Sequence, residues 1–517
     1  MTRYSRFTSL IALATSLCLA ASGCGNLAEV SSIPSSSTAS TAESGTAGES
    51  ETSFALPYTS NDTLNPYSAQ TKSNQELATL LYDSLIKLDA SMEPEYVIAD
   101  KITLNGTSCI IELKDVLFSD GSSVTAEDVT YSIQTAKGEG NGRYQTAVEN
   151  IASQSAASAK TVSITLKHPD PYFINLLDFP IFKRGTENNK NADNKALPPV
   201  GSGRYVYQAE GRHYWLEANS SWQGGGVGIE CIELKNLPDD EAVEYSIQTN
   251  GISAYYTNLS DNQIPKMNGT TISVPLFNLV YLGVNTTSGP LSEQSLRYVI
   301  SSAIDRAKFC ADIFYSAALP AAGPIPSCFE QVEGLQTISS EKNTDWVVAQ
   351  LNQLGYNNRD NEGYLTREGR RLSVRLLYNA DAPVRSTAAS YLASELKSVG
   401  IEVSLTGVAY ADYLRSVEAG EFDLYLAEMK LQNNFNLLPL VQVDAVAAPD
   451  SACRAVAQSF SEGGGSLSEL LSSFSEAMPI IPLCHRTGLL SISTRLQGSP
   501  TPGFSDIYAG LEHCELS

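Results

Sequence analysis

The sequence predicts an α/β protein of two or three domains, and three observations support this. The chain has 517 residues, more than one ordinary domain holds, and 42% of them are hydrophobic, which is enough for a sizeable core. Apolar residues within 75–88 recur at three- and four-residue steps, which predicts a helix. Residues 109–133 read as a strand, a turn and a second helix.

The charge of the chain limits the classes of partner that it can bind. The formal net charge is −23, with 57 acidic against 34 basic residues. Such a chain repels nucleic acid and anionic lipid at long range. We therefore expect no nucleic-acid partner, and contact with a membrane only through an anchor.

The N-terminus predicts export. Arg3 and Arg6 precede an apolar stretch at residues 7–20, and the small residues Ala21, Ser22 and Gly23 follow. A basic start, a short apolar core and small residues before a break are typical of a signal peptide rather than a spanning helix. Small residues before Cys24 resemble a bacterial lipobox, although Ala21 stands where Leu is usual. The resemblance implies a signal peptide at 1–23 and lipidation of Cys24. The alternative is an ordinary secretory signal with a chance Cys.

Residues 24–52 predict a disordered tether. They are rich in Ser, Thr, Ala and Gly, and they contain too few apolar residues to offset the entropy of ordering. A flexible chain of this length reaches about 30 Å. No later segment approaches the ~20 apolar residues of a membrane span.

Seven cysteines remain after Cys18 and Cys24. They are Cys109, Cys231, Cys310, Cys328, Cys453, Cys484 and Cys514. An odd, scattered set is not a disulfide framework. Bridges Cys310–Cys328 or Cys484–Cys514 are compatible with the spacing, and buried free thiols are an equal alternative.

The segment LFSDGSSVTAEDVTYSI, residues 117–133, contains signals for the end of a strand, a turn and the start of a helix. A strand leads into the Asp120-Gly121 turn. Thr125 is the expected N-cap, and Asp128 at N3 suits the helix dipole. The apolar face that follows consists of Ala126, Val129, Ile133 and Ala136.

Residues 118–132 closely resemble the signature of family 5 bacterial solute-binding proteins, the peptide- and nickel-type receptors of ABC importers. Other landmarks follow in the family's order. They are PVGSGRY at 199–205 (with Arg204 where the family has Pro), LVYLGVN at 279–285, AIDR at 303–306, GEFDL at 420–424 and PIIPL at 479–483. The resemblance covers residues 53 to about 500.

The resemblance implies an α/β, two-lobe periplasmic-binding-protein-like fold of type II, cluster C. Lobe I would comprise residues 53–278, with an inserted subdomain at about 76–198. Lobe II would comprise residues 279–478, and residues 479–517 would return to lobe I. Hinge strands would join the lobes, which would close on a ligand. We expect a monomer without cofactor or metal, working with an ABC permease and ATPase.

The resemblance also indicates where the ligand would bind. The loop after the first strand lines the cleft in peptide-binding members, which points to Tyr67, Gln70, Thr71 and Lys72. Tyr281 and Asn285 lie on the hinge-proximal strand and are further candidates. For all of these, a solvated loop or a purely structural role is the alternative.

The second lobe departs from the peptide-binding pattern. Peptide binders place a Trp and then an Asp after the "fDl" strand, and the Asp pairs with the peptide ammonium. Met429 and Gln432 fall at these positions, so that ion pair looks lost, although a small shift would let Glu428 substitute. Lys430, if it points inward, would favour an anionic ligand. Asn434 completes the candidate set.

No motif in the chain requires an enzyme. No H-E-x-x-H, G-x-S-x-G or phosphate loop in a strand–helix context occurs. We therefore expect a non-enzymatic receptor for a peptide or peptide-like solute. The alternatives are a signalling or adhesion lipoprotein that kept the fold, or an exported hydrolase.

Overall fold

The computed structural model describes residues 53–138, 140, 142–191, 194–258, 269–336 and 338–517. Residues Glu51–Ser517 group into one unit by their contacts. The predicted signal peptide, the tether and Cys24 lie outside the described residues. Among the described helices, none has both the length and the apolar character needed to cross a bilayer.

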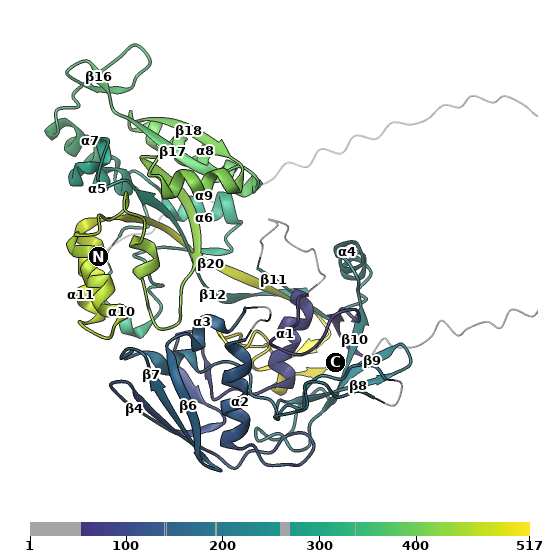
Figure 1. Ribbon diagram of the computed structural model, residues 1–517. Helices are drawn as coiled ribbons and strands as arrows, with labels where there is room; N and C mark the ends of the chain where they lie inside the picture. Colours follow the sequence, from purple (N-terminus) through teal and green to yellow (C-terminus); the bar gives the residue numbers. More distant parts are fainter. Residues whose placement is uncertain (1–52, 139, 141, 192–193, 259–268, 337) are drawn as a thin grey trace, which may run out of the picture. The chain divides into compact units, whose positions relative to one another are not determined.

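The first sheet pairs a strand at the start of the described chain with strands from residues 205–236 (Figure 1). The strand β1 (Phe54–Tyr58) is buried at every residue and lies parallel to β10 (Cys231–Asn236). Strands β9 (His213–Ala218) and β8 (Tyr205–Glu210) continue the sheet in antiparallel order. Helix α1 (Lys72–Leu81) packs its buried leucines against this sheet.

Helix α1 is shorter than the apolar spacing predicts. The predicted helix over 75–88 is right as far as Leu81 and wrong beyond it, because Tyr82 is extended and residues Ile86–Leu88 form β2, paired with β3 (Pro94–Tyr96). The carbonyls of Asp83 and Leu85 accept hydrogen bonds from distant backbone amides, at 2.8 Å from Ile181 and 3.0 Å from Val97. Tertiary pairing therefore replaces the helical bonds, while the apolar side chains remain buried.

The strand–turn–helix prediction around residue 120 is confirmed. Strand β5 (Ser108–Leu113) belongs to a four-stranded antiparallel sheet with β4 (Ala99–Asn105), β7 (Thr161–Leu166) and β6 (Ile151–Ser158). Gly121 has a φ of +80°, a backbone conformation that suits glycine at this turn. Helix α2 (Ala126–Ala136) starts with a capping box between Thr125 and Asp128 and buries its predicted face against β6 and β7.

The third sheet has seven strands and is built on two long ones. Strands β12 (Gly269–Val284) and β20 (Ile480–Ser493) pair along most of their length. Strands β11 (Ala254–Thr257) and β13 (Ala318–Pro320) pair with β20, and β19 (Leu424–Lys430) pairs with β12. Beyond β19, the strands β17 (Ser373–Asn379) and β18 (Glu402–Val408) are parallel, as the sequence predicts.

Helices and short elements complete the described chain. Longer helices are α4 (Asp240–Gln248), α5 (Gln294–Ser302), α6 (Arg306–Phe314), α7 (Thr344–Gln353), α8 (Pro383–Ser398), α9 (Tyr410–Glu418), α10 (Ala452–Ser461) and α11 (Leu467–Ala477). Single helical turns are α3 (Gln145–Val148), η1 (Phe173–Leu176), η2 (Pro290–Ser292), η3 (Glu330–Val332), η4 (Leu438–Val441) and η5 (Leu511–His513). Short strands are β14 (Asn358–Arg359), β15 (Leu365–Arg367), β16 (Arg370–Arg371), β21 (Leu496–Gln497) and β22 (Glu515–Leu516).

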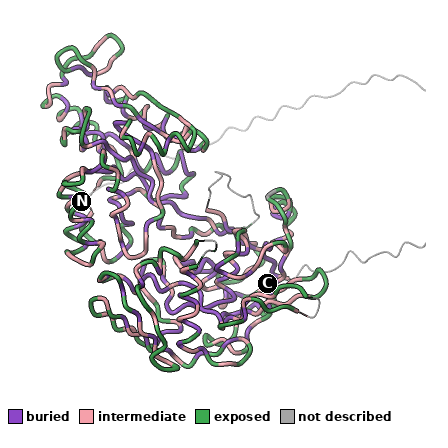
Figure 2. The backbone as a smooth tube through the Cα atoms, viewed as in Figure 1, coloured by how far each residue is buried: buried purple, intermediate pink, exposed green. Residues whose placement is uncertain are grey.

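Two hydrophobic cores form, and the long strands run through both (Figure 2). In β12, Val274 and Phe277 belong to the first core, whereas Leu282 and Val284 belong to the second. Two continuous strands therefore run from one core into the other. The exact lobe boundaries remain a prediction.

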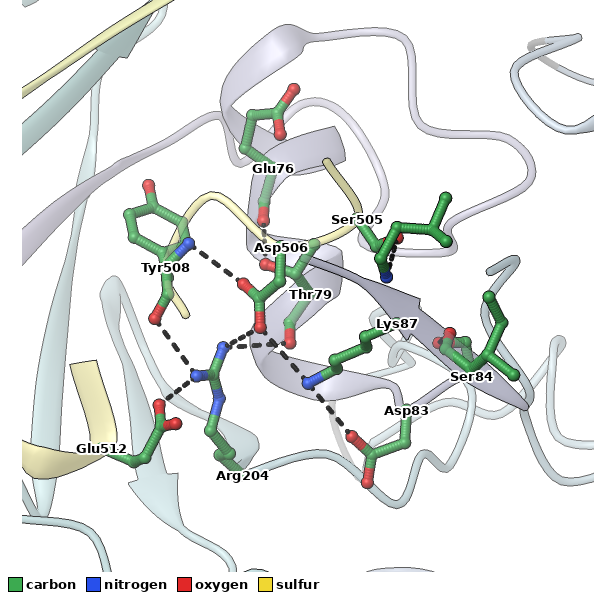
Figure 3. A network of polar contacts seen from close by, with 12 residues as sticks. Glu76, Thr79, Asp83, Ser84, Lys87, Arg204, Ser505, Asp506, Tyr508 and Glu512 are labelled. Carbon is green, nitrogen blue, oxygen red and sulfur yellow. Dashed lines mark hydrogen bonds and ion pairs between the residues drawn. The ribbon is translucent and has the colours of Figure 1, made fainter. Parts of the chain in front are cut away.

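The C-terminal segment is fixed by a buried ionic cluster around Arg204 (Figure 3). The Arg204 guanidinium donates to the carboxylates of Asp506, at 2.7 Å, and Glu512, and to the Tyr508 carbonyl at 3.1 Å. Lys87 Nζ donates to the same Asp506 carboxylate at 3.2 Å. The residue that departs from the family's Pro in PVGSGRY thus anchors the chain terminus.

Candidate ligand-binding site

A row of polar side chains crosses the seven-stranded sheet. Lys430 of β19 pairs directly with Asn278 of β12, which in turn pairs with Arg486 of β20. Directly paired residues of antiparallel strands present their side chains on the same face of the sheet. Glu428 lies two residues before Lys430 and therefore shares that face. The row forms one polar surface from three strands.

Glu428 is held inside this surface by two arginines. Its carboxylate accepts from Asn278 Nδ2 at 2.9 Å, Arg385 Nη2 at 2.6 Å and Arg486 Nη1 at 3.2 Å. Burial alone would raise the pKa of Glu428, but the guanidinium groups of Arg385 and Arg486 outweigh it, so the pKa is lowered. Both guanidinium groups thus share the Glu428 carboxylate.

Lys430 is the most accessible charge of the row. Its side chain is exposed, and within the described ranges its ammonium makes no hydrogen bond or ion pair. Desolvation nevertheless lowers the pKa of Lys430, and Arg143 lowers it further, whereas Asp178 and Glu76 act in the opposite direction. Lys430 is thus exposed, and charged groups from distant segments act on it.

Arg143 and Glu76 come from segments outside the seven-stranded sheet and form an ion pair, with 3.6 Å between Nη2 and Oε2. Glu76 belongs to α1, and Arg143 lies in the loop between α2 and α3. Burial would lower the pKa of Arg143, but Tyr144 and Glu76 raise it above its usual range, so the guanidinium stays charged. Tyr256 of β11 interacts electrostatically with both partners.

Asp178 supplies the second carboxylate near Lys430. Its Oδ2 accepts from Ser505 Oγ at 3.0 Å and from Asn433 Nδ2 at 3.4 Å. Burial raises the pKa of Asp178, although the Ser505 hydroxyl and the Lys430 ammonium oppose this. The loop that follows β19 thus reaches the segment that carries Asp178. We name Lys430, Arg143, Glu76 and Asp178 the charged quartet.

The predicted residues of the first loop make mainly protein contacts. Tyr67 is buried, and its hydroxyl donates to the Pro180 carbonyl. Thr71 donates from its amide and its hydroxyl to Asp62 Oδ2, each at 2.7 Å, and Gln70 is exposed. Lys72 places its ammonium 4.8 Å from the centre of the Tyr256 ring, so this residue reaches the vicinity of the charged quartet.

Tyr281 lies on β12 and Asn285 directly follows it, and both are buried. Tyr281 packs edge-on against Tyr425 with ring centres 6.0 Å apart. Asn285 donates to the carbonyls of Gly420 and Phe422, at 3.3 and 3.1 Å, and accepts from the residues that follow it. Both side chains are occupied by contacts that hold β12 to the segment around β19.

The remaining candidates, Gln432 and Asn434, lie in the loop after β19. Asn434 donates to Asp170 Oδ2 at 2.7 Å and is therefore tied to the segment before η1. Gln432 is half-buried, and its carbonyl closes the turn by accepting from Phe435 at 3.0 Å. Of the predicted residues, Lys430 thus belongs to the quartet, Glu428 shares its face of the sheet, and Lys72 lies beside Tyr256. Tyr67, Asn285 and Asn434 are held by other contacts.

Sequence reasoning missed Arg143, Glu76, Asp178 and Tyr256. Arg143 lies in a glycine-rich loop that resembles any solvated connection, and Glu76 lies on the polar side of a helix chosen for its leucines. They interact with Lys430 only in the tertiary structure, because the segments that carry them are distant in sequence. Nothing in the local sequence signals it.

Among the described residues, neither the cysteines nor the other side chains that commonly bind metals form a disulfide or a metal site. All seven described cysteines are free thiols, and that of Cys484 contacts that of Cys310, while Cys514 donates to the Gly510 carbonyl at 3.4 Å. In the parts of the chain that the structure covers, no three or more His, Cys, Asp or Glu side chains are arranged to hold a metal ion.

Comparisons with known proteins agree on one family. A family model described as bacterial extracellular solute-binding proteins, family 5 middle, matches residues 92–434. The oligopeptide-binding protein AppA of Bacillus subtilis is 24% identical over 367 residues, which are 67% of each chain. The glutathione-binding protein GsiB of Shigella flexneri is 27% identical over 281 residues, which are 51% of this chain and 54% of GsiB. The chain thus spans little more than half the length of the glutathione-binding relatives it matches.

Solved structures confirm the predicted α/β two-lobe fold. The unliganded open form of the murein tripeptide binding protein MppA has a TM-score of 0.71 at 19% identity, over 90% of this chain and 98% of that chain. NikA of Brucella suis, in complex with Fe(III)-EDTA, has a TM-score of 0.66 at 19% identity, over 90% and 99%. The matched relatives are named as binding proteins. The predicted resemblance is therefore confirmed, and the chain belongs to the family 5 bacterial extracellular solute-binding proteins.

Proposed function

We propose that this protein is the extracytoplasmic receptor of an ABC importer and that it captures a peptide or peptide-like small solute. The observation that carries the proposal is the charged quartet, in which Lys430 of the seven-stranded sheet interacts electrostatically with Glu76, Arg143 and Asp178 from segments outside that sheet. The family's peptide- and glutathione-binding members support this class of ligand. A permease and an ATPase are the partners that such a receptor requires.

Ligand capture would use the two predicted lobes as the two halves of a clamp. A solute bound at the quartet would touch the seven-stranded sheet and segments of predicted lobe I, and it would therefore favour arrangements in which the lobes approach each other. The long strands β12 and β20 would bend to allow this. The closed form would be the one that the permease recognises.

A ligand screen tests the receptor role. The mature chain, expressed without residues 1–23, is heated with peptides, amino acids, metal chelates and oligosaccharides. We expect one class to raise the melting temperature in a saturable manner, because a ligand that binds only the native state stabilises it. No stabiliser in the screen would contradict the proposal. Binding without uptake in cells that carry family 5 permease and ATPase subunits would instead favour a signalling lipoprotein.

We also propose that the protein is anchored to the outer face of the cell membrane through a lipid on Cys24. The small residues before Cys24 and the polar stretch that follows support this. Cys24→Ser should abolish incorporation of labelled palmitate and release the protein into the medium or periplasm. Cys18→Ser is the matched control and should remain anchored. Equal release of both variants would contradict the anchor.

A further inference from the structure

Two cysteines from distant segments lie against each other in the second core. Cys310 of α6 is 3% exposed, Cys484 of β20 is 0% exposed, and both belong to the same hydrophobic cluster. Their thiols are in contact. Because helix α6 and strand β20 are far apart in sequence, only the packing of one on the other can bring these thiols together.

Contacts on both sides of the cysteines fix that packing. At the start of α6, Arg306 Nε donates to the Pro482 carbonyl of β20 at 2.8 Å. At the end of α6, the guanidinium carbon of Arg486 lies 4.6 Å from the centre of the Phe314 ring. The helix is therefore joined to the strand at each of its ends.

The spacing of these contacts places the two cysteines opposite each other. Cys310 lies four residues after Arg306 and four before Phe314, so all three share one face of α6. Four helical residues rise about 6 Å, which is close to the ~6.6 Å that two strand residues span. Cys484 lies midway between the two β20 residues of those contacts, and it is thus the strand residue that matches Cys310.

The connection after α6 maintains this register. Tyr315 ends the helix with a φ of +50°, and β13 begins at Ala318. Strand β13 then pairs with β20 at Arg486, His485 and Cys484. The chain that leaves α6 is therefore bound to the same part of β20 that α6 contacts, which limits sliding of the helix along the strand.

We propose that Cys310 and Cys484 form a disulfide in an oxidising environment. A new bond joins the two Sγ atoms as each thiol loses its proton, and the two electrons reduce a low-molecular-weight disulfide to two thiols. Side chains already in contact between rigid elements suit the short span of a disulfide. The proposed extracytoplasmic location supplies the oxidising environment, and the receptor role does not depend on the bond.

Arg306 is the cation beside this pair. Its side chain is 1% exposed, and in the described part of the chain it donates to oxygens of Pro482, Ser301 and Ser339, with no carboxylate as partner. A guanidinium favours the thiolate, which is the attacking species. Burial nevertheless raises the pKa of Cys484. We therefore expect the bond to form during folding, before α6 covers β20.

The sequence spacing is compatible with other partners for these cysteines. Cys328 is exposed, and Cys514 belongs to the first core, whereas Cys310 and Cys484 belong to the second. The pairing that the structure favours is therefore neither of the two that the spacing alone suggests, and the experiment must separate all three.

Peptide mapping identifies the bond. The mature chain is reduced in urea, refolded with reduced and oxidised glutathione, denatured with iodoacetamide and digested with chymotrypsin. This protease cuts after Phe314 and so separates Cys310 from Cys328. We expect mass spectrometry to find Cys310 and Cys484 in one linked peptide and the buried Cys453 in an alkylated one.

Melting temperatures test the assignment independently. The wild type refolded in dithiothreitol should melt about 4 °C or more below the wild type refolded with glutathione, because a disulfide restricts the unfolded chain. Cys310→Ala should show no such difference between the two preparations. Cys453→Ala is the matched control, since Cys453 is a buried thiol of the first core, and it should retain the difference.

Three results would overturn the proposal. They are alkylation of both Cys310 and Cys484, a linked peptide that joins either of them to Cys328 or Cys514, and a melting difference that persists in Cys310→Ala. Ligand binding in the thermal screen is a separate measurement, so each of these results would leave the receptor role intact.

Discussion

Arg204 shows how strongly one residue can depend on distant partners. Its side chain is only 1% exposed, and its ion-pair partner Asp506 is 3% exposed. Burial would raise the pKa of Asp506, but Arg204 and Lys87 hold it below its usual value. Buried ion pairs are costly to break, because the remaining partner keeps its desolvation penalty.

We expect Arg204→Met to destabilise the protein by about 3–5 kcal/mol, because it leaves Asp506 and Glu512 without their guanidinium. Urea unfolding of the mature chain measures the change. Arg184→Met is the control, since its pair with Glu127 is exposed and should contribute only about 0–1 kcal/mol. Similar losses in both variants would argue against a special role for the buried cluster.

His485 gives a pH dependence with a defined sign. Burial lowers the pKa of His485 from its usual 6.5 to about 4, and its Nε2 contacts the Gly323 carbonyl at 3.2 Å. Because the folded pKa lies below the unfolded one, the unfolded chain binds the proton more readily. Stability linked to neutral His485 is present above pH 6.5 and is lost as the pH falls through about 4.

His485→Gln does not titrate, so the stability advantage of the wild type over this variant should shrink by about 3 kcal/mol between pH 7 and pH 4. Urea unfolding at a series of pH values measures it. The exposed His213→Gln provides a matched comparison. A wild-type advantage that is constant across this range would refute the linkage.

At the scale of elements, helix α2 shows what local sequence can predict. Its start at Thr125, its glycine turn and its buried face all follow from residues within about 15 positions of one another. Helix α1 shows the limit, because its apolar spacing continues past Leu81 while its backbone turns away to pair with residues around 97 and 181. Helix periodicity records burial, and burial in a strand can satisfy the same spacing.

The start of α2 depends on one carboxylate. Asp128 accepts from the Thr125 amide and, through its other oxygen, from the Arg184 amide, each at 2.9 Å. Asp128→Ala should therefore cost about 1–2 kcal/mol in urea unfolding. Glu127→Ala, at the exposed neighbouring position, should cost less than half as much. The reverse order would show that the cap contributes little.

The candidate site could be predicted only in part. Lys430 and Glu428 were found from the position of the strand that carries them. Arg143, Glu76 and Asp178 were not, because each belongs to a different local segment and only the tertiary fold brings them to Lys430. More of the fold than of the candidate site could be predicted from the sequence, since the landmarks of the fold are short, local and arranged in a fixed order.

At the scale of the whole molecule, net charge opposes folding. With 57 acidic and 34 basic residues, the compact state brings like charges together. Raising sodium chloride from 10 to about 150 mM shortens the screening length to about 8 Å and should raise the melting temperature. A melting temperature that falls with salt would contradict this view of the global charge.

The two long strands also determine how the protein can be divided in the laboratory. Because β12 and β20 contribute side chains to both cores, no single cut yields two self-contained pieces. A fragment comprising either core alone would carry a strand with unpaired backbone groups, which invites aggregation. Genetic dissection of this receptor, tag insertion and reporter fusion should therefore leave residues 269–284 and 480–493 uninterrupted and use surface connections elsewhere.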